Sequence, residues 1–196
     1  MSLVVADMSM SVDGFIAGPD DAVGPLFEWY ANGEVGFRFP GDGRQALVTE
    51  ASAGHLAEMV ARLGALICGR RLYDRTGGWG GSHPAGVPVF VVTHEAPESA
   101  PQGATPLHFV TDGVPSAIAR ATAVAGERMV VVASPTIAQQ CLDAGLLDAI
   151  QVNLVPVLLG AGIPFFQNLQ RSPVMLEDPE VIEGRRVTHL RYRVRR

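Results

Sequence analysis

The 196-residue sequence contains only two cysteines, Cys68 and Cys141, which lie far apart in the chain. Each is surrounded by apolar residues, so we expect a reduced, buried pair of small hydrophobic side chains and not a disulfide. The five histidines are spread over the chain without the spacing that is typical of metal ligands. The sequence therefore predicts no metal site.

An excess of positive charge and long hydrophobic runs are also absent. The formal net charge is −5 and the isoelectric point is near 5.5, which argues against nucleic acid or an anionic membrane as a partner. The basic C-terminal segment HLRYRVRR alternates in polarity, as a final strand does. No apolar run reaches about 18 residues, and the N-terminus lacks the pattern of a signal peptide. We expect a soluble cytoplasmic protein.

What the chain does contain is a globular composition, with 47% apolar and 18% charged residues, and we expect one domain over residues 1–196. Apolar runs and helical periodicities alternate through most of the chain, and two alternating runs around Glu183-Gly184 predict a C-terminal hairpin. This order favours an α/β fold with a mostly parallel central sheet, helices on both faces and an antiparallel edge. The predicted helices cover about residues 52–63, 112–127 and 134–145, with Ser52, Asp112 and Ser134 as N-caps.

The opening stretch, residues 2–18, predicts a strand that ends in a loop. Leu3 to Ala6 are apolar, small polar residues follow, and Asp13-Gly14 turns the chain toward another apolar segment. In an α/β sheet this pattern is typical of the floor of a ligand cleft. Asp13 is then either a cleft carboxylate or a simple turn residue.

Residues 19–54 are rich in glycine and proline, with a short helix expected at 26–33. Loops of this length are uncommon unless they cover a site, so the segment is a candidate lid. The alternative is a disordered surface loop.

Three predicted strand ends carry polar residues to the same edge of the sheet: Gly69-Arg70-Arg71, Thr93-His94 and Ala133-Ser134-Pro135-Thr136. Two of these open helices, whose free N–H groups favour an anion such as phosphate. Their convergence favours a nucleotide site. The segment GAGIPFF lacks the third glycine of a Rossmann motif, and the sequence has neither a phosphate-binding Gly-Lys-Ser/Thr loop nor a nucleophile elbow.

Five segments, taken together, resemble the dihydrofolate reductase superfamily: MSMSVDGFIAG, ICGRRLYDRTGGWGG, PVFVVTH, ASPTIAQQCLDAGLLD and NLVPVLLGAGIPFF. Within it, the chain is most similar to the reductase domain of the bifunctional riboflavin-biosynthesis deaminase/reductase and its stand-alone bacterial relatives. The resemblance implies a three-layer α/β/α fold that binds NADPH across the strand ends. No deaminase zinc motif is present, so the resemblance is to the reductase part alone.

The resemblance also implies roles for particular residues. Gly69, Arg70 and Arg71 would hold cofactor phosphates, and Thr93 and His94 would lie near the adenosine 2′-phosphate. The helix start, Ala133 to Ile137 with Ser134, Pro135 and Thr136, would take the pyrophosphate, and Ile16 and Ala17 would border the nicotinamide. The substrate cleft would lie between Asp13, the 26–30 segment with Trp29, and Trp79.

Two positions depart from the family pattern. Ala133-Ser134 stands where the family often has two glycines, and His94 stands where an Arg or Lys would select a 2′-phosphate more firmly. Both leave the preference for NADPH over NADH open.

Hydride transfer needs a proton supplied nearby. The resemblance to dihydrofolate reductases implies a substrate carboxylate in the short helix that contains Glu28, and Asp13 is the alternative candidate. For Glu28 the alternative is a solvated helix residue, and for Asp13 a carboxylate that ties the loop. Trp79, between glycine pairs, would stack on a flat heterocycle or anchor a loop.

These observations predict an NADPH-dependent reductase of a small pterin- or pyrimidine-like heterocycle. The alternatives are a nucleotide- or ligand-binding protein of the same fold without turnover, or a flavin-binding reductase. Related domains commonly pair through sheet edges or hairpins, so a homodimer is expected.

Overall fold

The computed structural model describes residues 2–195 and is built around an eight-stranded sheet with the strand order β11-β12-β9-β1-β8-β5-β6-β7. The six strands from β9 to β7 are parallel, and β12 and β11 add an antiparallel hairpin at one edge. The predicted fold class is confirmed. The strands are β1 Val4–Ser11, β5 Leu63–Gly69, β6 Val89–Val92, β7 Leu107–Val110, β8 Met129–Val132, β9 Ala149–Val155, β11 Glu180–Gly184 and β12 Val187–Arg193.

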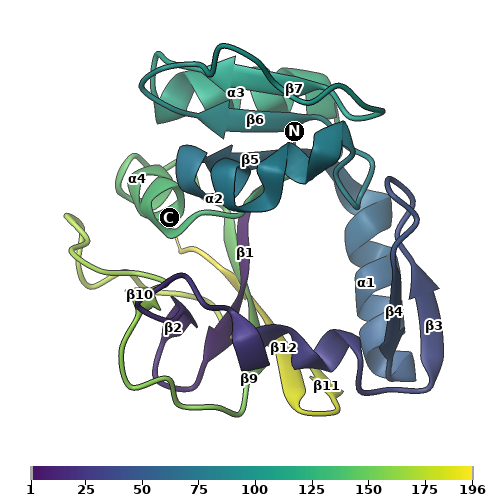
Figure 1. Cartoon of the computed structure of the whole chain (residues 1–196). Coiled ribbons are helices and arrows are strands. Elements are labelled where there is room, and N and C mark those ends of the chain that lie inside the picture. The colour runs from purple at the N-terminus through teal and green to yellow at the C-terminus, as the bar shows by residue number, and fades with distance from the viewer. Residues whose placement is uncertain (1, 196) are drawn as a thin grey trace.

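Helices cover both faces of this sheet, and β1 shows why. Its side chains alternate, so that Val4 and Ala6 pack in the core with helices α3 (Val114–Ala125) and α4 (Pro135–Asp143). Val5 packs on the opposite face, in the core shared with α2 (Arg70–Thr76). Figure 1 shows β1 running through the middle of the molecule, with α1 (Glu50–Arg62) along one side. The two cysteines are buried and free, as predicted.

The segment 19–54 is more ordered than its glycine content suggests. It forms a 3₁₀ helix, η1 (Gly24–Tyr30), in place of the predicted helix at 26–33, followed by a hairpin of β3 (Val35–Arg38) and β4 (Gln45–Val48) beside α1 (Figure 1). Gly33 is needed for close approach, since a Cβ atom there would lie 1.9 Å from the Val48 carbonyl carbon. A smaller pair, β2 (Phe15–Ala17) and β10 (Ile163–Pro164), lies beyond the end of β1.

Several predicted caps were wrong because other side chains or backbone groups take those positions. Thr49 caps α1 by accepting the N–H of Ser52, and Ser52 itself is buried inside the helix. Gly113 and not Asp112 precedes α3, and the Asp112 carboxylate accepts hydrogen bonds from side chains of that helix. Helix α1 ends at Arg62, because the chain enters β5 at Leu63. Among the described residues no helix is long and apolar enough to cross a membrane.

Candidate functional site

A cleft of about 1370 Å³ runs over the carboxyl ends of β5, β6 and β8 and continues across the face of β1 toward η1 and the β3–β4 hairpin. Parallel strands bring their carboxyl ends to one edge, so residues far apart in sequence meet there. All twelve predicted cofactor-binding residues line this cleft: Ile16, Ala17, Gly69, Arg70, Arg71, Thr93, His94, Ala133, Ser134, Pro135, Thr136 and Ile137.

The start of α4 forms one wall of the cleft. Ser134 does not cap the helix with its side chain; its hydroxyl instead accepts the backbone N–H of Gly69 over 2.8 Å, which ties β5 to the start of α4. Pro135 occupies the first turn of the helix. The first-turn N–H groups of α4 are therefore not engaged by the Ser134 side chain, and helix N–H groups in this position attract anions.

Two of the three arginines of α2, Arg71 and Arg75, have partners across the cleft. Arg71 donates to the Asp21 carboxylate at 2.8 Å, and Arg75 donates to the backbone carbonyls of Asp20 and Asp21. Arg70 pairs with Asp74 on its own helix at 2.8 Å. The contacts of Arg71 and Arg75 connect residues 20–21, which follow β2, to α2. Because the arginines are more than 40% exposed, each pair contributes little to stability and can exchange partners.

Trp79 lines the cleft on the segment η2 (Gly77–Gly81), in which every residue has a positive φ. Four glycines tolerate this left-handed path, but Trp79, with φ 52°, adopts it at a cost. Its ring packs edge-on against His83 at 4.8 Å between centroids. Burial lowers the pKa of His83 to about 4, so this neighbour is neutral at physiological pH.

Trp29 and Glu28 do not lie where they were predicted. Trp29 is only 1% exposed; it stacks on Tyr30 at 3.8 Å and donates its indole N–H to Ser9 over 3.3 Å. Tyr30 lines the cleft instead of Trp29. The two residues are adjacent in the short helix η1, so their side chains lie on different faces of it. Glu28 is exposed and is not among the residues that line the cleft.

Asp13 ties two loops together outside the cleft. Its carboxylate accepts the Ser11 hydroxyl at 2.5 Å and the backbone N–H groups of Leu159 and Gly160 at 3.2 and 2.7 Å. The Ser11 hydrogen bond is the main reason that its pKa lies below the usual value. Of the two readings that the sequence left open, this geometry corresponds to the loop-tying carboxylate.

Asp7, which the sequence analysis did not single out, is the carboxylate that lines the cleft floor. It lies in the middle of β1, on the same face as Ser9. Its two oxygens accept N–H groups from Gln151 (2.9 Å) and Asn153 (3.1 Å) of the neighbouring strand β9. Burial raises its pKa to about 6, against the lowering effect of these hydrogen bonds and of Arg191.

The model of the RibD C-terminal domain family matches residues 2–189, which is nearly the whole chain. The chain belongs to the RibD C-terminal domain family. No curated protein matches it. A protein from Shewanella sp. PV-4 assigned to riboflavin biosynthesis has a similar structure, with a TM-score of 0.73, 23% identity and 99% coverage of both chains.

Two further solved structures share the fold of this RibD-type domain. One is the diaminohydroxyphosphoribosylaminopyrimidine deaminase/5-amino-6-(5-phosphoribosylamino)uracil reductase of Thermotoga maritima, with a TM-score of 0.64 and 12% identity. The match covers 99% of this chain but only 57% of that protein. The other is dihydrofolate reductase of Enterococcus faecalis, solved with NADP(H), with a TM-score of 0.59, 14% identity and coverage of 99% and 97%.

A signal for Asp7 was present in the sequence of this RibD-type domain but was easily missed. The apolar run of the sequence ends at Ala6, whereas β1 continues to Ser11, so Asp7 is a carboxylate inside a strand and not in a loop. A charged residue inside a central strand is unusual unless it is paired or functional. Its partners on β9 lie about 145 residues away and leave no local pattern. No group of three or more His, Cys, Asp or Glu residues within 2–195 is arranged to hold a metal ion.

Proposed function

We propose that this RibD-type domain is an NADPH-dependent reductase that transfers a hydride to a small pterin- or pyrimidine-like heterocycle. The observation that carries the proposal is the continuity of one cleft. The first half of the cleft is lined by the carboxyl ends of β5, β6 and β8, the start of α4 and the arginines of α2. Its second half has a flat aromatic wall and a carboxyl floor. The names of the solved relatives, a pyrimidine reductase and a dihydrofolate reductase, support the same class of reaction.

The residues of the first half suit a dinucleotide. The start of α4 presents N–H groups to a pyrophosphate, and the hydrogen bond from the Gly69 N–H to the Ser134 hydroxyl holds the end of β5 against it. Arg71 would exchange Asp21 for a cofactor phosphate, because charge-assisted contacts to phosphate are stronger than an exposed ion pair. When bound, the reduced nicotinamide supplies the hydride.

The second half would hold the heterocycle. Tyr30 lines it and rests on the buried ring of Trp29, so its ring is held in place, and Trp79 lines the cleft on a separate wall. A planar substrate suits such walls because ring stacking adds to apolar burial. Arg44, from the β3–β4 hairpin, also lines the cleft, and its guanidinium pairs with Asp42 at 2.6 Å. The predicted lid segment thus contributes residues to the proposed substrate half.

Calorimetric titration with NADPH, and separately with NADH, tests the cofactor half. We expect micromolar NADPH binding that weakens about tenfold in Arg71→Gln, since a charge-assisted contact is worth roughly 1.5 kcal/mol or more. Asp21→Asn should tighten binding up to about fivefold by releasing Arg71, within the roughly 1 kcal/mol of an exposed pair. Arg120→Gln is the matched control, because Arg120 is an exposed arginine paired with Asp112 and does not line the cleft.

Oxidation of NADPH in the presence of a panel of pterins and pyrimidines then tests turnover. Binding of NADPH without oxidation by any of them would favour the ligand-binding alternative. A yellow purified protein with a flavin spectrum would favour the flavin-binding alternative. Failure of both NADPH and NADH to bind would refute the reductase proposal.

A further inference from the structure

The cleft floor contains a carboxyl that the fold does not need for packing. The central strands β5, β8 and β9 carry mostly apolar residues, and β1 carries buried Val5 on the face where Asp7 follows. Asp7 is partly exposed, and it is exposed to the cleft. A half-buried carboxyl in such a place is costly unless its protonation or its contacts serve a purpose.

A second layer of residues holds the two amides that contact Asp7 in one orientation. The Gln151 carbonyl oxygen accepts two N–H groups of Arg191, each at 3.2 Å, so its NH₂ group must face Asp7. The Asn153 carbonyl oxygen lies 2.7 Å from Nδ1 of His189, which orients its NH₂ group toward Asp7 as well. The carboxyl is therefore fixed from the β9 side by two oriented donors, and it keeps acceptor capacity for a further partner.

The His189 ring is oriented in turn. Its Nε2 lies 3.0 Å from the Ser52 hydroxyl of α1, and the ring stacks on His55 at 4.0 Å. Burial lowers the pKa of His189 to about 3 and that of His55 to about 4, so both rings are neutral near pH 7. Neither histidine therefore supplies a positive charge that would hold Asp7 ionised.

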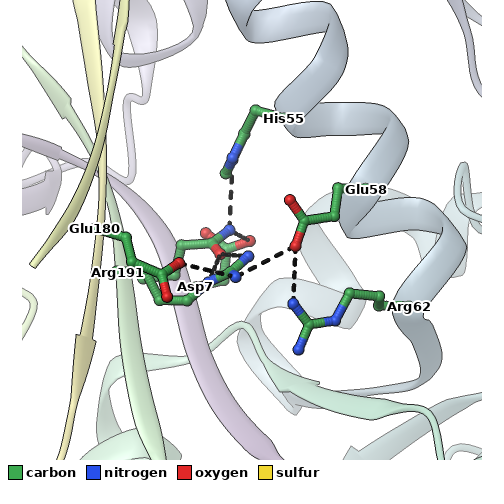
Figure 2. A network of polar contacts seen from close by, with 7 residues as sticks. Asp7, His55, Glu58, Arg62, Glu180 and Arg191 are labelled. Carbon is green, nitrogen blue, oxygen red and sulfur yellow. Dashed lines mark hydrogen bonds and ion pairs between the residues drawn. The ribbon is translucent and has the colours of Figure 1, made fainter.

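Charged side chains from α1, β11 and β12 lie around Asp7 (Figure 2). From β12, Arg191 contacts Gln151 and divides its charge between Glu58 of α1 (3.4 Å) and Glu180 of β11 (3.3 Å). Arg62 of α1 pairs with Glu58 from the other side at 2.8 Å.

On the cleft side, the titratable and charged groups near Asp7 are Arg44 and the Tyr30 hydroxyl, whose pKa is raised by burial and by Asp7. Among the contacts described, none pairs a cation directly with Asp7.

We propose that the Asp7 carboxyl contacts the heterocycle at the cleft floor and gives a proton to a ring imine nitrogen of it. The inference rests on the proposed function and names the proton donor of that reaction. The O–H bond of Asp7 breaks and an N–H bond forms on the substrate, whose neighbouring carbon accepts the hydride of the reduced nicotinamide. The N–H groups of Gln151 and Asn153 stabilise the carboxylate left behind, and a proton from solvent in the cleft restores the acid.

This role assigns a substrate class: a planar ring with a C=N bond, small enough to reach the floor between Tyr30 and β1. A carboxyl with a pKa near 6 is partly protonated at neutral pH, whereas one near 3.8 would hold no proton to give. Purely structural buried carboxylates with two amide partners would show the same hydrogen bonds. They would not show proton exchange coupled to a ligand, and the experiment uses this difference.

The first test follows the Asp7 carboxyl itself, by ¹³C NMR of aspartate-labelled protein with Asp7→Asn to assign the signal. The first probe is 7,8-dihydropterin, whose ring contains the N5=C6 imine. The second is 5,6-diaminouracil, whose ring contains no imine. We expect Asp7 to titrate near pH 6 in the free protein and to shift when dihydropterin is added without any nicotinamide. An ordinary titration near pH 4, or no change with either probe, would overturn the proposal.

The second test compares Asp7→Asn with Asp13→Asn, the matched carboxylate outside the cleft. Asp7→Asn should bind NADPH like the wild type but lose at least about 100-fold in turnover of dihydropterin, and its residual rate should lack the inflection near pH 6. Asp13→Asn should keep that inflection. An Asp7→Asn variant that is folded by circular dichroism and within threefold of wild-type turnover would overturn the proposal. Failure of the wild-type protein to bind NADPH would instead refute the proposed function. The NMR titration of Asp7, which is done without nicotinamide, would still test whether Asp7 binds a proton near pH 6.

Discussion

Replacement of Ser134 by alanine should destabilise the protein through a single hydrogen bond. Ser134 is 6% exposed, and its hydroxyl accepts the backbone N–H of Gly69 over 2.8 Å. Alanine fits the same space but leaves this N–H without that acceptor at the junction of β5 and α2. An unsatisfied, largely buried N–H costs about 1–3 kcal/mol. For a chain of this size, that corresponds to a decrease of roughly 3–10 °C in the melting temperature.

The assay is equilibrium unfolding in urea together with a thermal melt, and Thr136→Ala is the matched control. Thr136 lies in the first turn of the same helix, but it is exposed. Its replacement should change the free energy of unfolding by less than about 0.5 kcal/mol. Ser134→Gly, which restores a residue common in the family, should be at least as destabilising as Ser134→Ala because glycine also adds entropy to the unfolded chain. If Ser134→Ala melts within 1 °C of Thr136→Ala, the structural role of the hydroxyl is wrong.

Three further predictions concern the hairpin and the polar network. Gly33→Ala should destabilise by about 1–3 kcal/mol in urea unfolding, because the new methyl overlaps the backbone of β4, whereas Gly36→Ala on the open β3 strand should be nearly neutral. His189 has a lowered pKa of about 3, so below about pH 6.5 the unfolded chain binds more protons than the folded one. This residue alone should lower stability by about 2 kcal/mol from pH 7 to 5, the lowered pKa values of His55 and His83 add to the fall, and His189→Gln should remove about 2 kcal/mol of it. The raised pKa of Asp7 acts in the opposite sense over this range but is one group against three, so a stability that rises from pH 7 to 5 would contradict the lowered pKa values of the histidines. Arg191→Met should raise the pKa of Asp7 further in the NMR titration, since the guanidinium favours the carboxylate, and a lowered pKa would contradict this.

Local patterns were sufficient to place the cofactor half of the cleft. Gly69-Arg70-Arg71, Thr93-His94 and Ala133 to Thr136 each combine the end of an apolar run with polar residues, and two begin helices. Parallel strands with helical crossovers must bring such ends to one edge. Short-range sequence and general topology therefore led to nine of the residues that line the cleft, and the family resemblance added Ile16, Ala17 and Ile137. The helix caps were less predictable, because a hydroxyl such as that of Ser134 can accept an N–H from another element.

The glycine-rich segment shows a different limit of the sequence. The sequence predicts Gly33 as the end of a short helix in a glycine-rich segment, whereas in the structure it lets the backbone pass close to Val48 of β4. Glycine permits both flexible loops and close backbone contacts, and sequence alone does not distinguish them. The contact partner, which the fold supplies, decides between them.

The polar floor of the cleft was determined only by tertiary structure. The sequence indicated strands near Asp7, Gln151 and His189, but not that β9 lies between β1 and β12. Register then aligns Asp7 with Gln151, and Gln151 with Arg191, on one face. This alignment turns polar residues scattered over three strands into a network around one carboxyl. Such long-range pairing leaves no periodic trace in the chain, because each strand contributes only one or two of the residues.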